Sequence, residues 1–286
     1  MQKPVFWLRR AKQLTVLRLR EMFLIVSVAV ALFFSSVNCQ HLFPNDGSMV
    51  ELTVSQFKQQ VYGSTDKAYF VQFYQSWCSY CQDYASTWTR IARNVSAWNS
   101  LLQMAVVNCG GNDDLYYLCD DHNIAVTPTL KYFPFAARSA KDGQQFYDEV
   151  FDMYDHDFMV LYLASKVARD KGQPSYPRFT SLAKHEKLEN LRMRTETELV
   201  AVVIEKGRQH YLSNQVILDF SKSNSVAVFS ASPHHPVVSS KRFANFPAVL
   251  LYRAGKFESP LYKSKYRVRR DTAARIIRWG LKKLRR

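Results

Sequence analysis

The sequence is poor in several features on which common classes of function depend. Only nine of its 286 residues are glycine, and none of them belongs to the kind of glycine-rich loop that cradles phosphate groups. No motif of the kind that carries a hydrolase triad is present either. Because 47% of the residues are hydrophobic, a disordered chain is excluded, and the length allows about two domains with buried cores.

Cysteine is scarce too, with five residues, and none follows Cys119. The second half of the chain is therefore unable to exchange disulfides. A single C-x-x-C motif occupies residues 78–81, directly after an apolar run over 69–74 and Trp77. This order predicts a dithiol at a strand-to-helix junction, where N–H groups at the helix start favour the thiolate of Cys78. Such a dithiol performs thiol–disulfide exchange.

The segments around this dithiol resemble the thioredoxin superfamily. More narrowly, they are similar to the two thioredoxin-like domains that begin the quiescin sulfhydryl oxidases, which are related to protein disulfide isomerases. The resemblance implies an α/β fold with two tandem thioredoxin-like domains, each a central mixed sheet flanked by helices, the second without cysteine. The resemblance is carried by residues 71–81, 105–109, 124–130 and 246–256.

Composition divides the chain into four parts. Six basic residues precede an apolar run over 22–37, so we expect residues 1–39 to be a signal peptide cleaved near Cys39 or, alternatively, a retained signal anchor. Secretory entry implies an oxidising compartment, namely the endoplasmic reticulum, the Golgi or the extracellular space. The other expected parts are a redox-active domain over 46–169, a linker over 170–177, and a redox-inactive domain over 178–286 with a basic C-terminal helix.

Hydrophobic periodicity predicts the order of elements in both domains. The expected elements of the first are strands over 49–53, 68–74, 102–108 and 129–133, helices over 54–62, 78–98, 115–122 and 158–169, and a hairpin near 142–143. Those of the second are strands over 199–204, 225–230 and 248–252, a helix over 212–220 and a turn at 254–255. Because Phe246-Pro247 corresponds to Thr127-Pro128, the halves resemble a divergent duplication.

The formal net charge of +15 is unevenly distributed. Removing the expected leader takes away six basic residues and Glu21, which leaves +10. Residues 263–286 hold eleven Lys or Arg and one acid, so the rest of the mature chain is near neutral. Apolar residues at helical spacing favour an amphipathic helix with a solvated basic face here over contact with an anionic surface. Nucleic acid is not expected as a partner, and membrane contact is expected only if the leader is retained.

Cys109 and Cys119 enclose a loop rich in Gly, Asn and Asp that is long enough to bring their sulfurs together. A four-thiolate zinc site is a weaker alternative, because the chain has only one close pair of cysteines. The resemblance implies that Cys109 and Cys119 form a structural disulfide. We therefore expect no metal site.

The resemblance also implies roles at the dithiol, with Cys78 as the nucleophile and Cys81 as the resolving cysteine. The peptide bond before Pro128 is expected to be cis, with a backbone that faces the dithiol and pairs with an extended substrate. The simpler alternatives are an inert structural disulfide and an ordinary strand-edge proline. The expected substrate-binding residues are Trp77, Tyr80, Thr127 and Pro128.

The chain departs from these relatives at two places. Their central strand carries Glu six residues before the first cysteine, where this chain has Gln72, and their usual Cys-Gly-His-Cys dithiol has His at the place of Tyr80. Glutamine cannot titrate, and a phenol stays neutral near pH 7. Because the acid relays protons and the His stabilises the thiolate, we expect a slower and less oxidising site.

These features favour a secretory-pathway thiol–disulfide oxidoreductase whose partners are thiol- or disulfide-containing proteins. A complete quiescin oxidase passes electrons to FAD in a downstream helical domain; no such domain follows here, so we expect neither a cofactor nor oxygen reduction in this chain alone. The alternatives are the N-terminal part of a flavin-dependent sulfhydryl oxidase and a non-catalytic thioredoxin-fold binding or chaperone module. Asn94, in the only Asn-x-Ser/Thr sequon, is a candidate glycosylation site.

Overall fold

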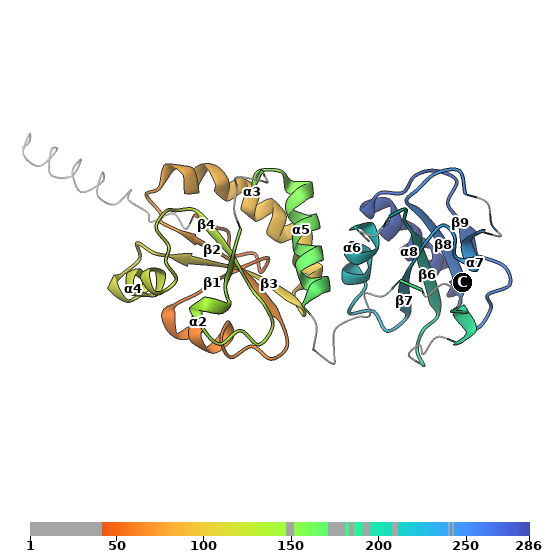
Figure 1. Cartoon of the computed structure of the whole chain (residues 1–286), viewed down its shortest axis with the longest axis horizontal. Helices are drawn as coiled ribbons and strands as arrows, with labels where there is room; N and C mark the ends of the chain where they lie inside the picture. The colour runs from red at the N-terminus through yellow and green to blue at the C-terminus, as the bar shows by residue number, and fades with distance from the viewer. Residues whose placement is uncertain are drawn as a thin grey trace, which may run out of the picture. The chain divides into compact units, whose positions relative to one another are not determined.

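The computed structural model describes residues 42–146, 152–170, 181–182, 186–190, 195–207, 211–239, 241 and 243–286. Two β-sheets lie within these residues, each flanked by helices (Figure 1). The strands of the first sheet are β1 (Val50–Glu51), β2 (Ala68–Tyr74), β3 (Leu102–Asn108), β4 (Thr129–Phe133) and β5 (Gln144–Gln145).

The first sheet has the strand order β1-β3-β2-β4-β5. Strands β1, β3 and β2 run parallel, whereas β4 pairs antiparallel with β2 and β5 antiparallel with β4. Every residue of β2 is buried, as expected for a central strand that is covered on both faces. The dithiol follows the end of this strand.

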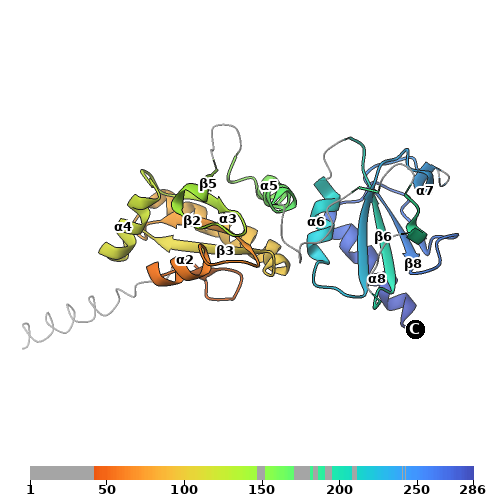
Figure 2. The same cartoon turned by 60° about the horizontal axis from the view of Figure 1, so that its bottom comes forward.

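Helices cover both faces of the first sheet (Figure 2). They are α2 (Val54–Gln60), α3 (Ser79–Val95), α4 (Asp113–Asp121) and α5 (His156–Arg169). Phe70 of β2 packs against Trp88 of α3 and Tyr162 of α5, with ring centroids 5.3 and 6.2 Å apart. Phe73 points to the opposite face and joins the core beneath α2 and α4. Because side chains alternate along a strand, Gln72 shares the face of Phe70 and looks toward α3.

Polar caps move two helix starts away from the predicted positions. The Asn112 side chain accepts a hydrogen bond from the N–H of Leu115, so α4 begins at Asp113 and not at residue 115. The Asp155 carboxylate likewise caps α5, which begins at His156 and not at residue 158. The apolar periodicity starts only after the first turn of each helix, which is why it placed both starts too late.

The second sheet repeats the first, and in the place of β1 a parallel bridge joins Ser181 to Ser230 of its edge strand. Its strands are β6 (Leu199–Ile204), β7 (Val226–Ala231), β8 (Ala248–Arg253) and β9 (Tyr262–Lys263). The order β7-β6-β8-β9, with β6 and β7 parallel and β8 antiparallel, matches β3-β2-β4-β5. A cis X-Pro bond precedes β4 at Pro128 and β8 at Pro247. The prediction of two tandem thioredoxin-like domains, the second without cysteine, is confirmed.

The C-terminal segment forms an amphipathic helix. The helices of the second domain are α6 (Tyr211–Asp219), α7 (Pro236–Ser239) and α8 (Arg270–Leu284). Helix α8 buries Ala273, Ala274 and Ile277 against the sheet and exposes most of its basic residues. Gly280 permits this packing, because a Cβ there would lie 2.8 Å from a Leu251 methyl carbon. Among the described residues no helix combines the length and the apolar character needed to cross a membrane.

Two of the expected parts of the chain lie largely outside the described residues. The leader over 1–39 is wholly outside them, and so is the linker over 170–177 except for its first residue. That residue, Asp170, accepts hydrogen bonds from the Tyr132 hydroxyl and the Phe135 N–H at 3.0 and 2.8 Å. By its contacts Asp170 therefore belongs to the first domain.

A histidine is buried in the core of the first domain. His122 has no exposed surface, and its Nε2 lies 2.7 Å from the Tyr62 hydroxyl among the rings of Phe57 and Phe73. Burial, assisted by the nearby Lys131 ammonium, lowers the pKa of His122 from 6.5 to about 4. The neutral ring is therefore the form that the folded core holds.

Acidification from pH 7 to pH 4 should therefore destabilise the protein. The unfolded chain binds a proton at His122 between about pH 6.5 and pH 4 and the folded chain does not, so the free energy of unfolding falls as pH decreases, by up to about 3 kcal/mol. Urea unfolding at several pH values measures this slope. His122→Gln, which keeps a hydrogen-bonding group for Tyr62 but cannot titrate, should flatten it; an unchanged slope would assign the acid sensitivity to other groups.

Candidate active site

The dithiol lies at the start of α3. Cys78 adopts an extended backbone conformation and is the N-cap residue of the helix. Its Sγ accepts a hydrogen bond from the N–H of Cys81 at 3.2 Å. The helix start thus points its unsatisfied N–H groups, and the positive end of its dipole, at the first sulfur.

The two sulfurs differ in accessibility. Cys78 is 7% exposed, whereas Cys81 has no exposed surface. Both are free thiols. The Cys78 thiol donates to the carbonyl oxygen of Thr127 at 3.4 Å. An incoming sulfur therefore meets Cys78 first, beside the peptide bond that precedes Pro128.

The environment separates the acidities of the two thiols. Burial disfavours the Cys78 thiolate, but hydrogen bonds from the Cys81 thiol, from Thr127 and from the N–H groups of Cys81 and Tyr80 outweigh it, so the pKa of Cys78 is lowered. Burial and the neighbouring Cys78 raise the pKa of Cys81 to about 11. The more accessible thiol, Cys78, is thus the more acidic of the two, and the fully buried Cys81 thiol is the less acidic.

Strand pairing brings Thr127 and Pro128 to the dithiol. Strand β4 runs antiparallel to β2 and sets Thr129 opposite Phe73, so the residues before β4 lie beside those that follow β2. The Thr127 hydroxyl donates to Gln75 Oε1 at 3.3 Å, which ties the two loops together. The Thr127–Pro128 peptide bond is cis.

Apolar side chains surround the dithiol. Trp77 and Tyr80 are 71% and 70% exposed. They border a recess of about 690 Å³ that opens beside Cys78. The sequence did not single out several residues of its wall, because they come from α4 and the loop before Pro128. The recess is lined by Gln75, Trp77, Cys78, Ser79, Tyr80, Cys109, Tyr116, Cys119, Asp120, Ile124, Ala125, Val126 and Thr127.

The other two cysteines of the domain are bonded to each other. The Cys109–Cys119 disulfide joins the end of β3 to α4, with Cα atoms 5.8 Å apart. Two of the four sulfurs that a thiolate zinc site would require are therefore unavailable as thiolates. Within the described part of the chain, no cluster of three or more His, Cys, Asp or Glu side chains is placed to hold a metal ion.

A polar side chain lies buried on the face of β2 that looks toward α3. Gln72 has no exposed surface, and neither its Nε2 nor its Oε1 finds a hydrogen-bond partner among the described residues. An unpaired buried amide is costly, at about 1–3 kcal/mol for each group. It occupies the position where the relatives named above carry a buried Glu.

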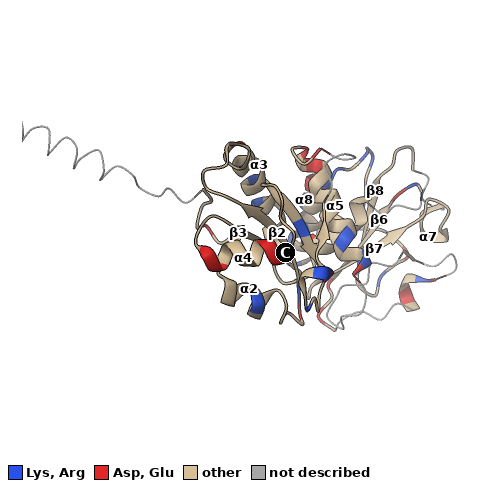
Figure 3. Ribbon diagram, turned by 60° about the vertical axis from the view of Figure 1, so that its left-hand side comes forward, with Lys and Arg blue, Asp and Glu red and all other residues tan. Residues whose placement is uncertain are grey.

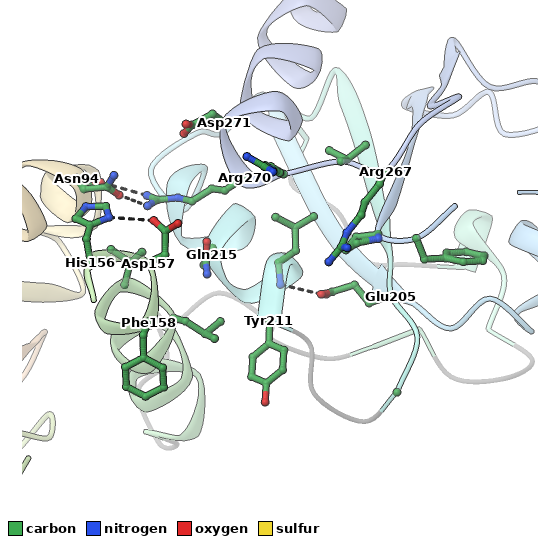
Figure 4. Close-up of a pocket in the computed structure, with 18 of the residues that line it drawn as sticks. Asn94, His156, Asp157, Phe158, Glu205, Tyr211, Gln215, Arg267, Arg270 and Asp271 are labelled. Atoms are coloured by element: carbon green, nitrogen blue, oxygen red, sulfur yellow. Dashed lines mark hydrogen bonds and ion pairs between the residues drawn. The ribbon is translucent and has the colours of Figure 1, made fainter. Parts of the chain in front are cut away.

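The second domain holds a carboxylate near the corresponding strand end. Glu205 directly follows β6 and is buried; its two oxygens accept hydrogen bonds from the N–H groups of Leu212 and Ser213 at 2.8 and 2.9 Å. Figure 4 draws the first of these bonds beside Glu205. In the first domain the Cys78 sulfur receives such an N–H group. The second domain therefore has a buried carboxyl group that accepts helix-start N–H groups, where the first domain has a sulfur; a cis bond also precedes Pro247.

Asn94 lies in the last turn of α3, away from the dithiol. Its side-chain Oδ1 accepts a hydrogen bond from the Arg270 guanidinium, as Figure 4 shows. Arg270 also pairs with Asp219 and stacks over Trp98 at 4.9 Å. The sequon asparagine is thus exposed and hydrogen-bonded, and its occupancy by a glycan remains a prediction.

Comparison with known proteins agrees with this geometry. Residues 48–154 match the thioredoxin family model. This segment contains the dithiol, the Cys109–Cys119 disulfide and the cis bond before Pro128. The first domain is therefore thioredoxin-like in sequence as well as in fold.

The chain is more specifically similar to sulfhydryl oxidases. It is 30% identical to sulfhydryl oxidase 1 of Homo sapiens over 194 residues, which cover 66% of this chain and 25% of the relative. Identity to sulfhydryl oxidase 2 of Homo sapiens is 28% over 168 residues, 59% of this chain and 24% of the relative. The chain thus spans about a quarter of the length of these relatives.

A solved structure shares the fold of both domains. The crystal structure of full-length ERdj5 aligns with 90% of this chain and 34% of its own, with a TM-score of 0.55 and 16% sequence identity. At this level of identity the likeness concerns the fold alone. Its coverage extends beyond the segment that the family model matches, which agrees with a second domain of the same class.

Proposed function

We propose that this protein is a thiol–disulfide oxidoreductase that exchanges disulfides in protein clients through Cys78 and Cys81. The observation that carries the proposal is the Cys78 sulfur, which has a lowered pKa and lies 3.4 Å from the Thr127 carbonyl at the mouth of an apolar recess. Similarity to sulfhydryl oxidases supports the same chemistry. We further propose that it works in the secretory pathway, on proteins that bear thiols or disulfides, with no cofactor of its own.

The test is exchange between the reduced protein and a peptide that contains one disulfide. The exchange is monitored by the increase in fluorescence when the disulfide of the peptide opens. Protein whose thiols have been blocked with iodoacetamide is the control. We expect exchange only from the unblocked protein, and alkylation of Cys78 to reach half its maximal rate below the ordinary thiol pKa of about 8.5. A protein with two titratable thiols but no exchange above the blocked control would refute the proposal.

A second candidate function is suggested by the similarity to sulfhydryl oxidases. The chain would then take electrons from clients and pass them to a flavin held by another polypeptide region. Oxygen consumption in the presence of a reduced client, with and without an added flavin-binding sulfhydryl oxidase domain, distinguishes the two. Consumption that depends on the added domain and on free Cys78 would favour the second function; exchange without consumption would favour the first.

A further inference from the structure

We infer that the recess beside Cys78 selects client segments that carry a large apolar side chain and a Lys or Arg close to the reacting cysteine. The inference rests on the proposed function and adds a substrate class to it. The recess has the size of pockets that bind small ligands or short stretches of chain. Cys78 lines the recess, so a client side chain that binds in the recess lies beside the reacting sulfur.

The wall of the recess leaves large apolar side chains uncovered. Tyr116 is 58%, Val126 is 69% and Trp77 is 71% exposed, and all three line the recess. Exposed aromatic and aliphatic groups around a concavity mark a surface that gains free energy when an apolar group enters it. The occupant should therefore present a large apolar side chain.

The electrostatics of the recess point to a cation. Asp120 is the one Asp, Glu, Lys, Arg or His among the described residues that line it. Helix α4 carries acids in both its first and its last turn and no basic residue, so its two ends stand out as acidic in Figure 3. A negative charge beside the dithiol attracts positively charged segments.

The position of Asp120 supports a role in binding a client and not in stabilising the fold. It lies in the last turn of α4, which itself contains no basic residue; the Lys131 ammonium binds the carbonyl of the C-cap residue, His122, and not the Asp120 carboxylate. In the described part of the chain no salt bridge engages its carboxylate. The charge is thus available to a visiting Lys or Arg at little cost to existing contacts.

Four disulfide-linked peptides test the inference. They are identical except at the two residues next to the cysteine. The residue before it is Leu or Gly, and the residue after it is Lys or Glu. At low ionic strength we expect the Leu/Lys peptide to exchange about tenfold faster than the Leu/Glu peptide, and the ratio to shrink in high salt. Asp120→Asn should reduce the Lys/Glu ratio toward one, and Asp120→Lys should invert it.

Matched variants keep the test specific. Asp113→Asn removes a charge from the same helix outside the recess and should keep the Lys/Glu ratio. Tyr116→Ser should reduce the Leu/Gly ratio, whereas Tyr117→Ser, which changes an exposed neighbour that does not line the recess, should not. Equal rates for all four peptides, or equal effects of Asp113→Asn and Asp120→Asn, would overturn the inference.

A neutral small disulfide separates this inference from the proposed function. Bis(2-hydroxyethyl) disulfide carries neither charge nor a large apolar group, so it reports the dithiol alone. If the wild-type protein exchanges it but does not discriminate among the peptides, the selectivity is wrong and the function stands. If the protein exchanges neither the neutral disulfide nor any peptide, the proposed function itself fails.

Discussion

Cys81→Ala should trap the protein as a mixed disulfide with its client, whereas Cys78→Ser should abolish exchange. The Cys78 thiolate attacks one client sulfur, forms a Cys78–client bond and expels the other client sulfur, which takes up a proton. Cys81, after losing its proton, then attacks Cys78, and the second client thiol leaves. The client gains two electrons and the dithiol loses two. Without Cys81 the sequence stops at its first product.

Mass spectrometry of the reaction mixture measures this outcome. Cys81→Ala should accumulate one client per chain, releasable by a small thiol, while Cys78→Ser should fall in rate by at least ~10³-fold, on the order of the loss that follows removal of an enzyme nucleophile. Ser86→Ala, which changes an exposed residue of α3 that does not line the recess, is the control and should behave as wild type. Trapping at Cys81 in the Cys78→Ser protein, at the wild-type rate, would reverse the assignment of the two thiols.

The sequence was sufficient to predict the strands that position this dithiol. The bounds of β2, β3 and β4 agree with the predicted ones, because each strand is rich in apolar, β-branched and aromatic residues. The C-x-x-C spacing fixed the pair of thiols, and the resemblance supplied the cis bond before Pro128. These features are local, or follow from the pairing of neighbouring strands.

The recess was not predictable, because its wall is assembled from distant residues. Tyr116 and Asp120 reach the dithiol only because the Cys109–Cys119 disulfide ties α4 to the end of β3 and the Cys109 N–H donates to the Tyr74 carbonyl at 2.7 Å. Nothing in the local pattern of α4 indicates which of its faces turns toward Cys78. Only the composition of α4 indicated a binding role: its last turn carries acidic residues, which the helix dipole disfavours there.

Gln72→Glu should accelerate the step that depends on Cys81. Burial is the largest cause that raises the pKa of Cys81, to about 11 in the free dithiol, so this thiol must lose a proton before it resolves the mixed disulfide. Gln72 is buried on the face of β2 that looks toward α3 and cannot accept that proton. A carboxylate there can, and a gain of about 10²-fold lies at the lower end of general acid–base catalysis. Single-turnover release of client from a preformed Cys78 mixed disulfide measures it.

Gln72→Leu distinguishes proton transfer from a change in packing. It removes the unpaired amide without adding a titratable group, so it should raise the free energy of unfolding and leave the release rate unchanged. The Glu variant should behave differently with pH as well: burial raises its pKa in the folded state, so its contribution to stability is present below about pH 4.3 and is lost as pH rises through the folded value. Equal acceleration by the Leu and Glu variants would attribute the slow resolution to packing around Cys81. Acceleration by the Glu variant alone, with its loss of stability above about pH 4.3, would show that the wild-type domain lacks a proton acceptor at Gln72.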